Sequence, residues 1–153
     1  MSNIEELASR LEKAKEHNCL IEVISLRIQY MDIWLRVFFA NTPHDEKRDQ
    51  EFGRLLKQCF RLGLEKNLYD QILAFNKKRV QAIHGYLLGN ISYDSLSTAI
   101  DASDGLAEKL VEFVICNSGE PVTQNFFNEP HNRGDCVYSI PALLHVLHAR
   151  PVL

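Results

Sequence analysis

The chain has 153 residues, of which 46% are hydrophobic and 24% charged, and its formal net charge at pH 7 is −3. These values are typical of one soluble globular domain with a real hydrophobic core. The four cysteines lie far apart without a CxxC pair, which argues against a zinc ribbon or a thioredoxin-like site, and the polar first residues are unlike a signal peptide. We therefore expect a reduced, cytoplasmic protein.

Apolar residues recur at helical spacing through the first three quarters of the chain. They predict five helices, over about residues 3–17, 20–40, 44–62, 66–88 and 93–117. The second carries apolar residues around much of its circumference, which indicates a helix at the centre of the molecule or at an interface. Charged residues such as Arg27 and Asp32 interrupt this helix, so it is not expected to span a membrane.

Breaking and capping residues set the expected ends of these helices. Thr42 and Pro43 suit the N-cap and the first turn of the third helix. Gly63 is expected to end that helix, and either Gly85 or Gly89 is expected to end the fourth.

Beyond residue 118 the helical pattern stops. Residues 119–139 contain proline and glycine with little periodicity and are expected to form an extended arm or loop, before a possible short helix at 142–149. The predicted fold class is all-α: an antiparallel bundle of four to five helices in residues 1–118, with an irregular C-terminal tail in residues 119–153. The tail is open to three interpretations: a partner-binding arm, a dimer swap or a lid over a cleft.

Charge is unevenly distributed along the chain. Residues 1–53 carry 7 basic and 10 acidic side chains, residues 54–84 carry 7 and 2, and residues 85–153 carry 3 and 8. A basic segment attracts phosphates locally even in an acidic protein, although a solvated helix face would show the same pattern. The candidate phosphate-binding residues of this segment are Lys77, Lys78, Arg54, Lys57 and Arg61.

The basic segment also holds an arginine and a histidine five residues apart, Arg79 and His84. Histidine transfers protons near neutral pH and arginine binds phosphate, so the pair supplies the groups that metal-free RNA cleavage needs. If Tyr69 and Leu87 mark the centre of the apolar face of this helix, Asn76 also lies near that centre. Arg79 and His84 then fall on either side of it, which predicts a polar cleft or a subunit interface.

The segment from Asn76 to Tyr86 resembles the signature of HEPN domains, small helical bundles in which an arginine, four to six residues and a histidine are often followed by glycine. Here the spacer is four residues and Gly85 follows. The resemblance covers the helical layout of residues 1–117 but not the tail. This chain departs from the family at Val80, where members often carry a polar residue, frequently asparagine.

The resemblance implies a homodimer whose two motifs meet in one cleft, with RNA as the substrate and no cofactor or metal. Arg79 would stabilise the transition-state phosphate, His84 would transfer protons, and Asn76 would support them. The ribose 2′-OH would attack and leave a 2′,3′-cyclic phosphate. Many members act in toxin–antitoxin or other defence systems, which implies an antitoxin or a nucleotidyltransferase-like partner protein and no membrane.

Two other interpretations of the motif stay open. In the first, the chain is a catalytically inactive HEPN-like bundle that serves as a dimerisation or protein-interaction module. In the second, it is a structural bundle with a chance match, because a histidine near a helix end interacts with the helix dipole and an arginine at the edge of an apolar face extends to water.

Two further groups of residues were considered as sites. The spacing of Cys136, His145 and His148 matches no zinc-finger pattern, so no metal site is predicted, and nearby His131 is read as a surface residue. Three aromatic residues near the motif either stack on bases or belong to the core or an interface: Phe75, Tyr86 and Tyr93.

Overall fold

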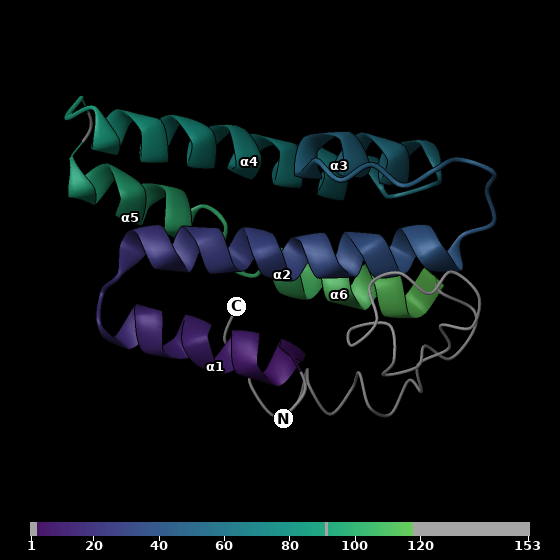
Figure 1. The fold of residues 1–153 in the computed structure, drawn as a ribbon, viewed down its shortest axis with the longest axis horizontal. Helices are drawn as coiled ribbons and strands as arrows, with labels where there is room; N and C mark the ends of the chain where they lie inside the picture. Colours follow the sequence, from purple (N-terminus) through teal and green to yellow (C-terminus); the bar gives the residue numbers. More distant parts are fainter. Residues whose placement is uncertain (1–2, 91, 118–153) are drawn as a thin grey trace.

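The structure is a computed structural model that describes residues 3–90 and 92–117. Within these ranges the secondary structure consists of six α-helices and no strands (Figure 1). They are α1 (Asn3–Glu16), α2 (Leu20–Asn41), α3 (Phe52–Arg61), α4 (Lys66–Leu87), α5 (Tyr93–Asp101) and α6 (Leu106–Asn117). The predicted all-α bundle is thus confirmed, whereas the tail at 119–153 and its possible helix at 142–149 lie outside the described residues. None of the helices described is long and apolar enough to cross a membrane.

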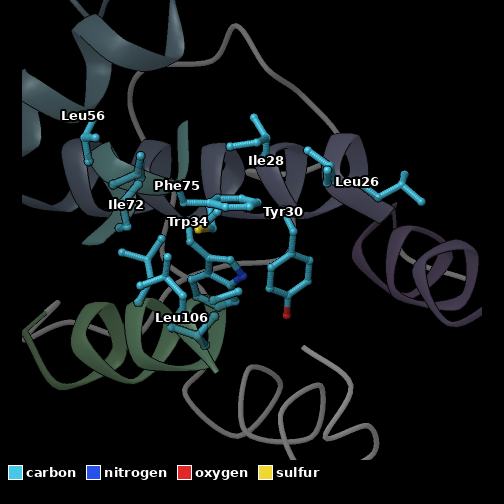
Figure 2. Close-up of a cluster of buried hydrophobic side chains, with 14 of the residues drawn as sticks. Leu26, Ile28, Tyr30, Trp34, Leu56, Ile72, Phe75 and Leu106 are labelled. Carbon is cyan, nitrogen blue, oxygen red and sulfur yellow. The ribbon is translucent and has the colours of Figure 1, made fainter. Parts of the chain in front are cut away.

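Helix α2 lies at the centre of the bundle, which is one of the two positions that its sequence predicted. It contacts α1, α3, α5 and α6, and 13 of its 22 residues are buried. Its Trp34 is completely buried and lies in one cluster with Phe75 of α4 and Leu106 of α6 (Figure 2). Burial of a large apolar side chain contributes about 1.5–3 kcal/mol, so this cluster holds the layers of the bundle together.

Helix α3 begins at Phe52 and not near residue 44, so the prediction for its start was wrong. Thr42 ends α2 instead of beginning α3, because its backbone N–H and its hydroxyl both donate to the Phe38 carbonyl, at 3.1 and 2.8 Å. Residues 43–49 have no regular secondary structure. The extended backbone of Thr42 suits the residue before Pro43, since proline disfavours a helical conformation there.

The predicted helix at 93–117 is two helices, α5 and α6, separated by a turn. Gly105 in this turn has a φ of +72°, which favours glycine. The fully buried guanidinium of Arg27 in α2 donates to the Ile100 carbonyl and to Ser103 Oγ, both at 2.6 Å, and pairs with Asp104 at 2.7 Å. The break therefore depends on a residue that lies 73 positions earlier in the chain, which local periodicity does not reveal.

Glycines in the left-handed conformation end α3 and α4. Gly63 has a φ of +109°, and the next residue, Leu64, donates its N–H to the Cys59 carbonyl at 2.9 Å, as in a Schellman motif. Gly89 has a φ of +74° and occupies the same position after α4. Gly89 therefore ends α4, whereas Gly85 lies within the helix.

Candidate functional site

Helix α4 carries the Arg/His motif in its second half, beyond the region that α3 covers. Figure 1 shows α3 beside the start of α4 and α5 beside its end, and both contacts are present in the structure. A Cβ added to Gly53, near the start of α3, would lie 3.9 Å from Asn76 Nδ2, in the middle of α4. The contact between α3 and α4 thus reaches Asn76, and the motif begins one turn later.

Asn76 and Arg79 are half-buried, and each has a buried polar atom without a hydrogen-bond partner in the described part of the chain. These atoms are Asn76 Oδ1, an acceptor, and Arg79 Nε, a donor. Buried polar atoms without partners are rare, and each costs about 1–3 kcal/mol. The two residues are three apart and therefore neighbours on the helix surface. The polar cleft or subunit interface that the sequence indicated on this face stays a prediction.

His84 is exposed and points away from Arg79. Residues five apart in an α-helix differ in direction by about 140°, and Arg79 follows the buried Ile72 by seven residues, so it points toward the bundle. The sequence placed the centre of the buried face at Tyr69 and Leu87. That placement was wrong, because Leu87 is 71% exposed. One copy of the chain does not bring Arg79 and His84 onto the same side of α4.

Three apolar side chains are exposed around His84: Val80 at 40%, Leu87 at 71% and Leu88 at 74%. We call them the apolar strip of α4. Val80 and Leu87 are seven residues apart and lie on one side of the helix, past Asn76, where the start of α3 contacts α4. The sequence pattern placed Leu87 at the centre of the apolar face, but no described helix covers this side of α4.

The five predicted phosphate-binding residues fall into two groups. Arg54 and Arg61 are paired with carboxylates of the segment before α3: Arg54 Nε lies 3.1 Å from Glu51, and Arg61 Nη2 lies 2.7 Å from Glu46. The hydrogen bond from Arg61 lowers the pKa of the Glu46 carboxyl. The other three residues are exposed and form no ion pair within the described residues: Lys57, Lys77 and Lys78.

The aromatic residues near the motif have different environments. Phe75 is 3% exposed and belongs to the core, so its side chain is not available to stack on a base. Tyr86 is 37% exposed and makes an edge contact with Tyr93 of α5, with ring centroids 5.7 Å apart. The Tyr93 hydroxyl accepts from the Leu20 N–H at 2.9 Å and donates to the Asn18 carbonyl at 2.5 Å. It thereby attaches the start of α5 to the turn between α1 and α2.

A concave surface with a volume of about 320 Å³ lies between the start of α4 and the end of α6, away from the Arg/His motif. Its lining includes Gln71, Lys109 and Cys116. This surface could not be predicted from local sequence patterns, because the two helices that form it are far apart in the chain.

Within the described residues no group of three or more histidine, cysteine, aspartate or glutamate side chains is placed to hold a metal ion. The three tail residues considered as zinc ligands lie outside the described residues, and so does nearby His131: Cys136, His145 and His148. No protein-family model matches the chain, and neither a curated protein nor a solved structure matches it.

Proposed function

We propose that this chain is a metal-independent endoribonuclease of HEPN type, and the environment of Arg79 supports this best. Its guanidinium emerges half-buried from the bundle beside Asn76, with a buried Nε that no described group satisfies. The outer nitrogens of a guanidinium that is only half-buried can donate to a phosphate oxygen. His84, exposed and five residues later, supplies a proton-transfer group near neutral pH.

In the proposed reaction, the ribose 2′-OH attacks the adjacent phosphorus and the bond to the 5′-oxygen breaks. His84 takes the proton from the 2′-OH or gives one to the leaving 5′-oxygen, and Arg79 stabilises the charge on the phosphate. The products are a 2′,3′-cyclic phosphate and a 5′-hydroxyl. Because Arg79 and His84 point about 140° apart on one helix, we propose that a second copy of the chain completes the site.

The test is cleavage of structured RNA by the purified protein in EDTA. We expect the wild type to cleave and the variants Arg79→Ala and His84→Ala to lose at least about a hundredfold in rate, as for removal of a general acid–base group. Two matched controls, Arg10→Ala and His17→Ala, replace exposed residues of the same types elsewhere. A His84→Ala protein that cleaves at the wild-type rate would refute the assignment. Cyclic phosphate ends on the product would identify the 2′-OH as the nucleophile.

The apolar strip of α4 favours a second candidate function, a catalytically inactive protein-interaction module. Val80, Leu87 and Leu88 offer apolar contacts, and the pairing of Arg54 and Arg61 with carboxylates leaves fewer free charges for RNA. An antitoxin or a nucleotidyltransferase-like protein is the partner that the family resemblance suggests. Absence of cleavage across several RNAs, together with loss of partner binding in a Leu87→Asp variant, would favour this function.

A further inference from the structure

Phe60 and Tyr69 form a stacked aromatic pair at the surface, where the end of α3 meets the start of α4. Their ring centroids are 4.4 Å apart and their planes differ by 21°. Phenylalanine is among the residue types most often buried, yet Phe60 is 38% exposed. Tyr69 covers one face of the Phe60 ring, so the exposed part of Phe60 consists of its other face and its edges. The proposed reaction gives this pair no role.

The segment before α3 is attached to a different side of that helix. Gln58 holds it: the Gln58 Nε2 donates to the Lys47 carbonyl, and the Gln58 Oε1 accepts from the Asp49 N–H, both at 2.9 Å. Gln58 and Phe60 differ in direction by about 160° around the helix, at about 100° per residue. The exposed part of the Phe60 ring thus lies on the side of α3 that faces α4, away from this segment.

Lys57 lies beside the aromatic pair. Gly53 neighbours Asn76, and Phe60 stacks on Tyr69, so α3 and α4 run antiparallel. Lys57 comes one turn before Phe60 and is its neighbour on the helix surface. It is exposed and forms no ion pair within the described residues. A positive charge without a carboxylate partner is therefore present next to the exposed ring.

A second lysine and His84 lie on the same side of α4 as Tyr69. Tyr69, Lys77 and His84 fall within about 80° of one another around the helix, and Tyr69 and His84 are about 22 Å apart along it. Lys77 is exposed and forms no ion pair in the described part of the chain. The acidic neighbour of Tyr69, Asp70, is paired with Lys66 at 2.6 Å. This side of α4 therefore presents an aromatic ring, a free positive charge and a histidine, in that order.

We propose that the exposed face of Phe60 is a stacking platform for an unpaired RNA base, and that Lys57 and Lys77 bind the phosphates next to that base. The proposal rests on the proposed function, since it places one RNA strand along α4 in the direction of His84. Stacking on an aromatic ring accepts any base, because every base has a flat face, and lysines bind the backbone without reading sequence. The substrate class that fits is single-stranded RNA, such as a loop or an end, because a duplex covers its base faces.

The two lysines favour RNA over a protein partner at this surface. Aromatic residues occur in both kinds of interface, but lysine is depleted from the core of protein–protein interfaces. A protein partner that covered Phe60 would also remove Lys57 from water, which is costly for a charge without a partner. An RNA strand instead brings a phosphate next to each base. Ring and charge together therefore match a nucleotide.

The test measures binding of a single-stranded RNA of about twelve nucleotides to the full chain by fluorescence anisotropy. Its riboses carry 2′-O-methyl groups, so the strand cannot be cleaved through the 2′-OH. Phe60→Leu keeps an apolar side chain but removes the flat ring, and we expect it to weaken binding at least about fivefold. Phe60→Tyr keeps the ring and should bind like the wild type. On the same strand paired with its complement, Phe60→Leu should have no effect, because the base faces are covered.

Two other variants separate stacking from charge and from position. Phe60→Leu should leave the slope of log K against log salt as in the wild type, whereas Lys57→Ala should reduce it by about 0.7. The matched aromatic control is Tyr86→Leu: Tyr86 is 37% exposed and contacts Tyr93 by an edge, near the other end of α4. We expect this control to leave the affinity unchanged. Circular dichroism checks that each variant is folded.

A second measurement needs no variant. A single-stranded RNA that carries 5-iodouridine forms a crosslink, on irradiation, with an aromatic side chain on which the modified base stacks. Mass spectrometry then identifies the crosslinked peptide, and we expect Phe60 of the wild-type chain.

The outcomes distinguish this inference from the proposed function. Wild-type affinity of Phe60→Leu for the single strand would overturn the platform and leave the proposed ribonuclease in place. Crosslinks at Tyr86 and none at Phe60 would do the same, and would move the stacking to the region of the motif. A wild-type chain that binds neither the single strand nor the duplex would overturn both the platform and the proposed function.

Discussion

Arg27 is the buried charge on which the second half of the bundle depends. It lies in the central helix, is 1% exposed, and satisfies the Ile100 carbonyl and the Ser103 hydroxyl at the end of α5. Its ion-pair partner Asp104 is largely exposed, so the structural contribution comes mainly from the buried contacts. In the sequence alone, Arg27 is only a charge that argues against a membrane span.

Replacement of Arg27 by alanine is expected to lower the free energy of unfolding by about 3 kcal/mol, because it leaves buried polar groups and a cavity. Urea denaturation followed by circular dichroism measures the change. Asp104→Asn is the comparison: it keeps an acceptor for the Arg27 guanidinium and the buried contacts to Ile100 and Ser103, so we expect it to cost less than Arg27→Ala. Equal costs for the two variants would contradict this account.

Cys59 and Tyr30 predict a loss of stability at alkaline pH. Burial raises the pKa of the Cys59 thiol from 9.0 to about 12 and that of the Tyr30 phenol from 10.0 to about 12. Between pH 9 and pH 12 the unfolded chain releases protons that the folded chain retains, so the free energy of unfolding falls as pH rises. Below pH 9 this contribution is fully present.

Urea denaturation at a series of pH values measures this decline. Cys59→Ala lowers stability overall because it leaves a cavity, but it should make the alkaline decline shallower. Tyr30→Phe removes the other buried group that titrates, and it should also make the loss of stability shallower, at the higher pH values of the series. If neither variant changes the slope, other groups cause the decline.

At the residue scale, the sequence placed Leu87 in the apolar face of α4, but Leu87 and Val80, its neighbour on that side, are exposed. Helical spacing shows which residues share a side of a helix. It does not show where the neighbouring helix ends. Val80 and Leu87 lie on the side of α4 that α3 covers, but α3 reaches only as far as Asn76. The apolar periodicity therefore continues from buried positions into exposed ones.

At the scale of elements, the helix that differs most from its prediction is α3. The sequence predicted its end at Gly63, because a glycine after an apolar pattern is a strong local signal. Its start was missed by eight residues, because Thr42 and Pro43 also serve to end α2. Residues 44–51 lie between the predicted and the observed start of α3. Two acidic side chains of this segment, Glu46 and Glu51, pair with Arg61 and Arg54 of α3. That pairing could not be predicted from a charge count.

Gly63→Ala is expected to destabilise the protein by about 1 kcal/mol, because alanine disfavours the left-handed backbone at φ +109°. No atom lies within 4 Å of the added Cβ, so the cost is conformational. Gly53→Ala is the matched control: its nearest neighbours lie at 3.9 Å and its backbone is helical, so we expect no loss of stability. Thermal denaturation compares the two variants, and a larger loss for Gly53→Ala would be inconsistent with this explanation.

At the scale of the whole molecule, the basic patch is smaller than the sequence suggests. The segment at 54–84 carries seven basic side chains, but several are paired with carboxylates, and Lys57, Lys77 and Lys78 are the exposed candidates without such a pair in the described chain. The all-α class and the central place of α2 followed from periodicity. The electrostatic surface did not, because it depends on which residues meet after folding.

Lys77→Ala with Lys78→Ala is expected to weaken RNA binding several-fold and to reduce the slope of log K against log salt by about 1.4, or 0.7 for each lost contact with single-stranded RNA. Arg54→Ala with Arg61→Ala removes the same formal charge, but carboxylates already neutralise these residues, so the slope should change little. Fluorescence anisotropy over a range of salt concentrations measures both. An equal effect of the two pairs would show that the ion pairs do not hold in solution.

The two ends of α5 are attached to the first part of the chain, at its start through the Tyr93 hydroxyl and at its end through Arg27. Both connections join residues more than 70 positions apart. During synthesis, the second half of α4 therefore leaves the ribosome before the helix that supports it, and it gains that support only when residues up to Asp104 have followed. Long-range contacts of this kind form late in folding because closing the chain over such distances costs entropy. A nascent chain would thus present the Arg/His motif on an unsupported helix, and the site would mature only as synthesis of the bundle nears its end.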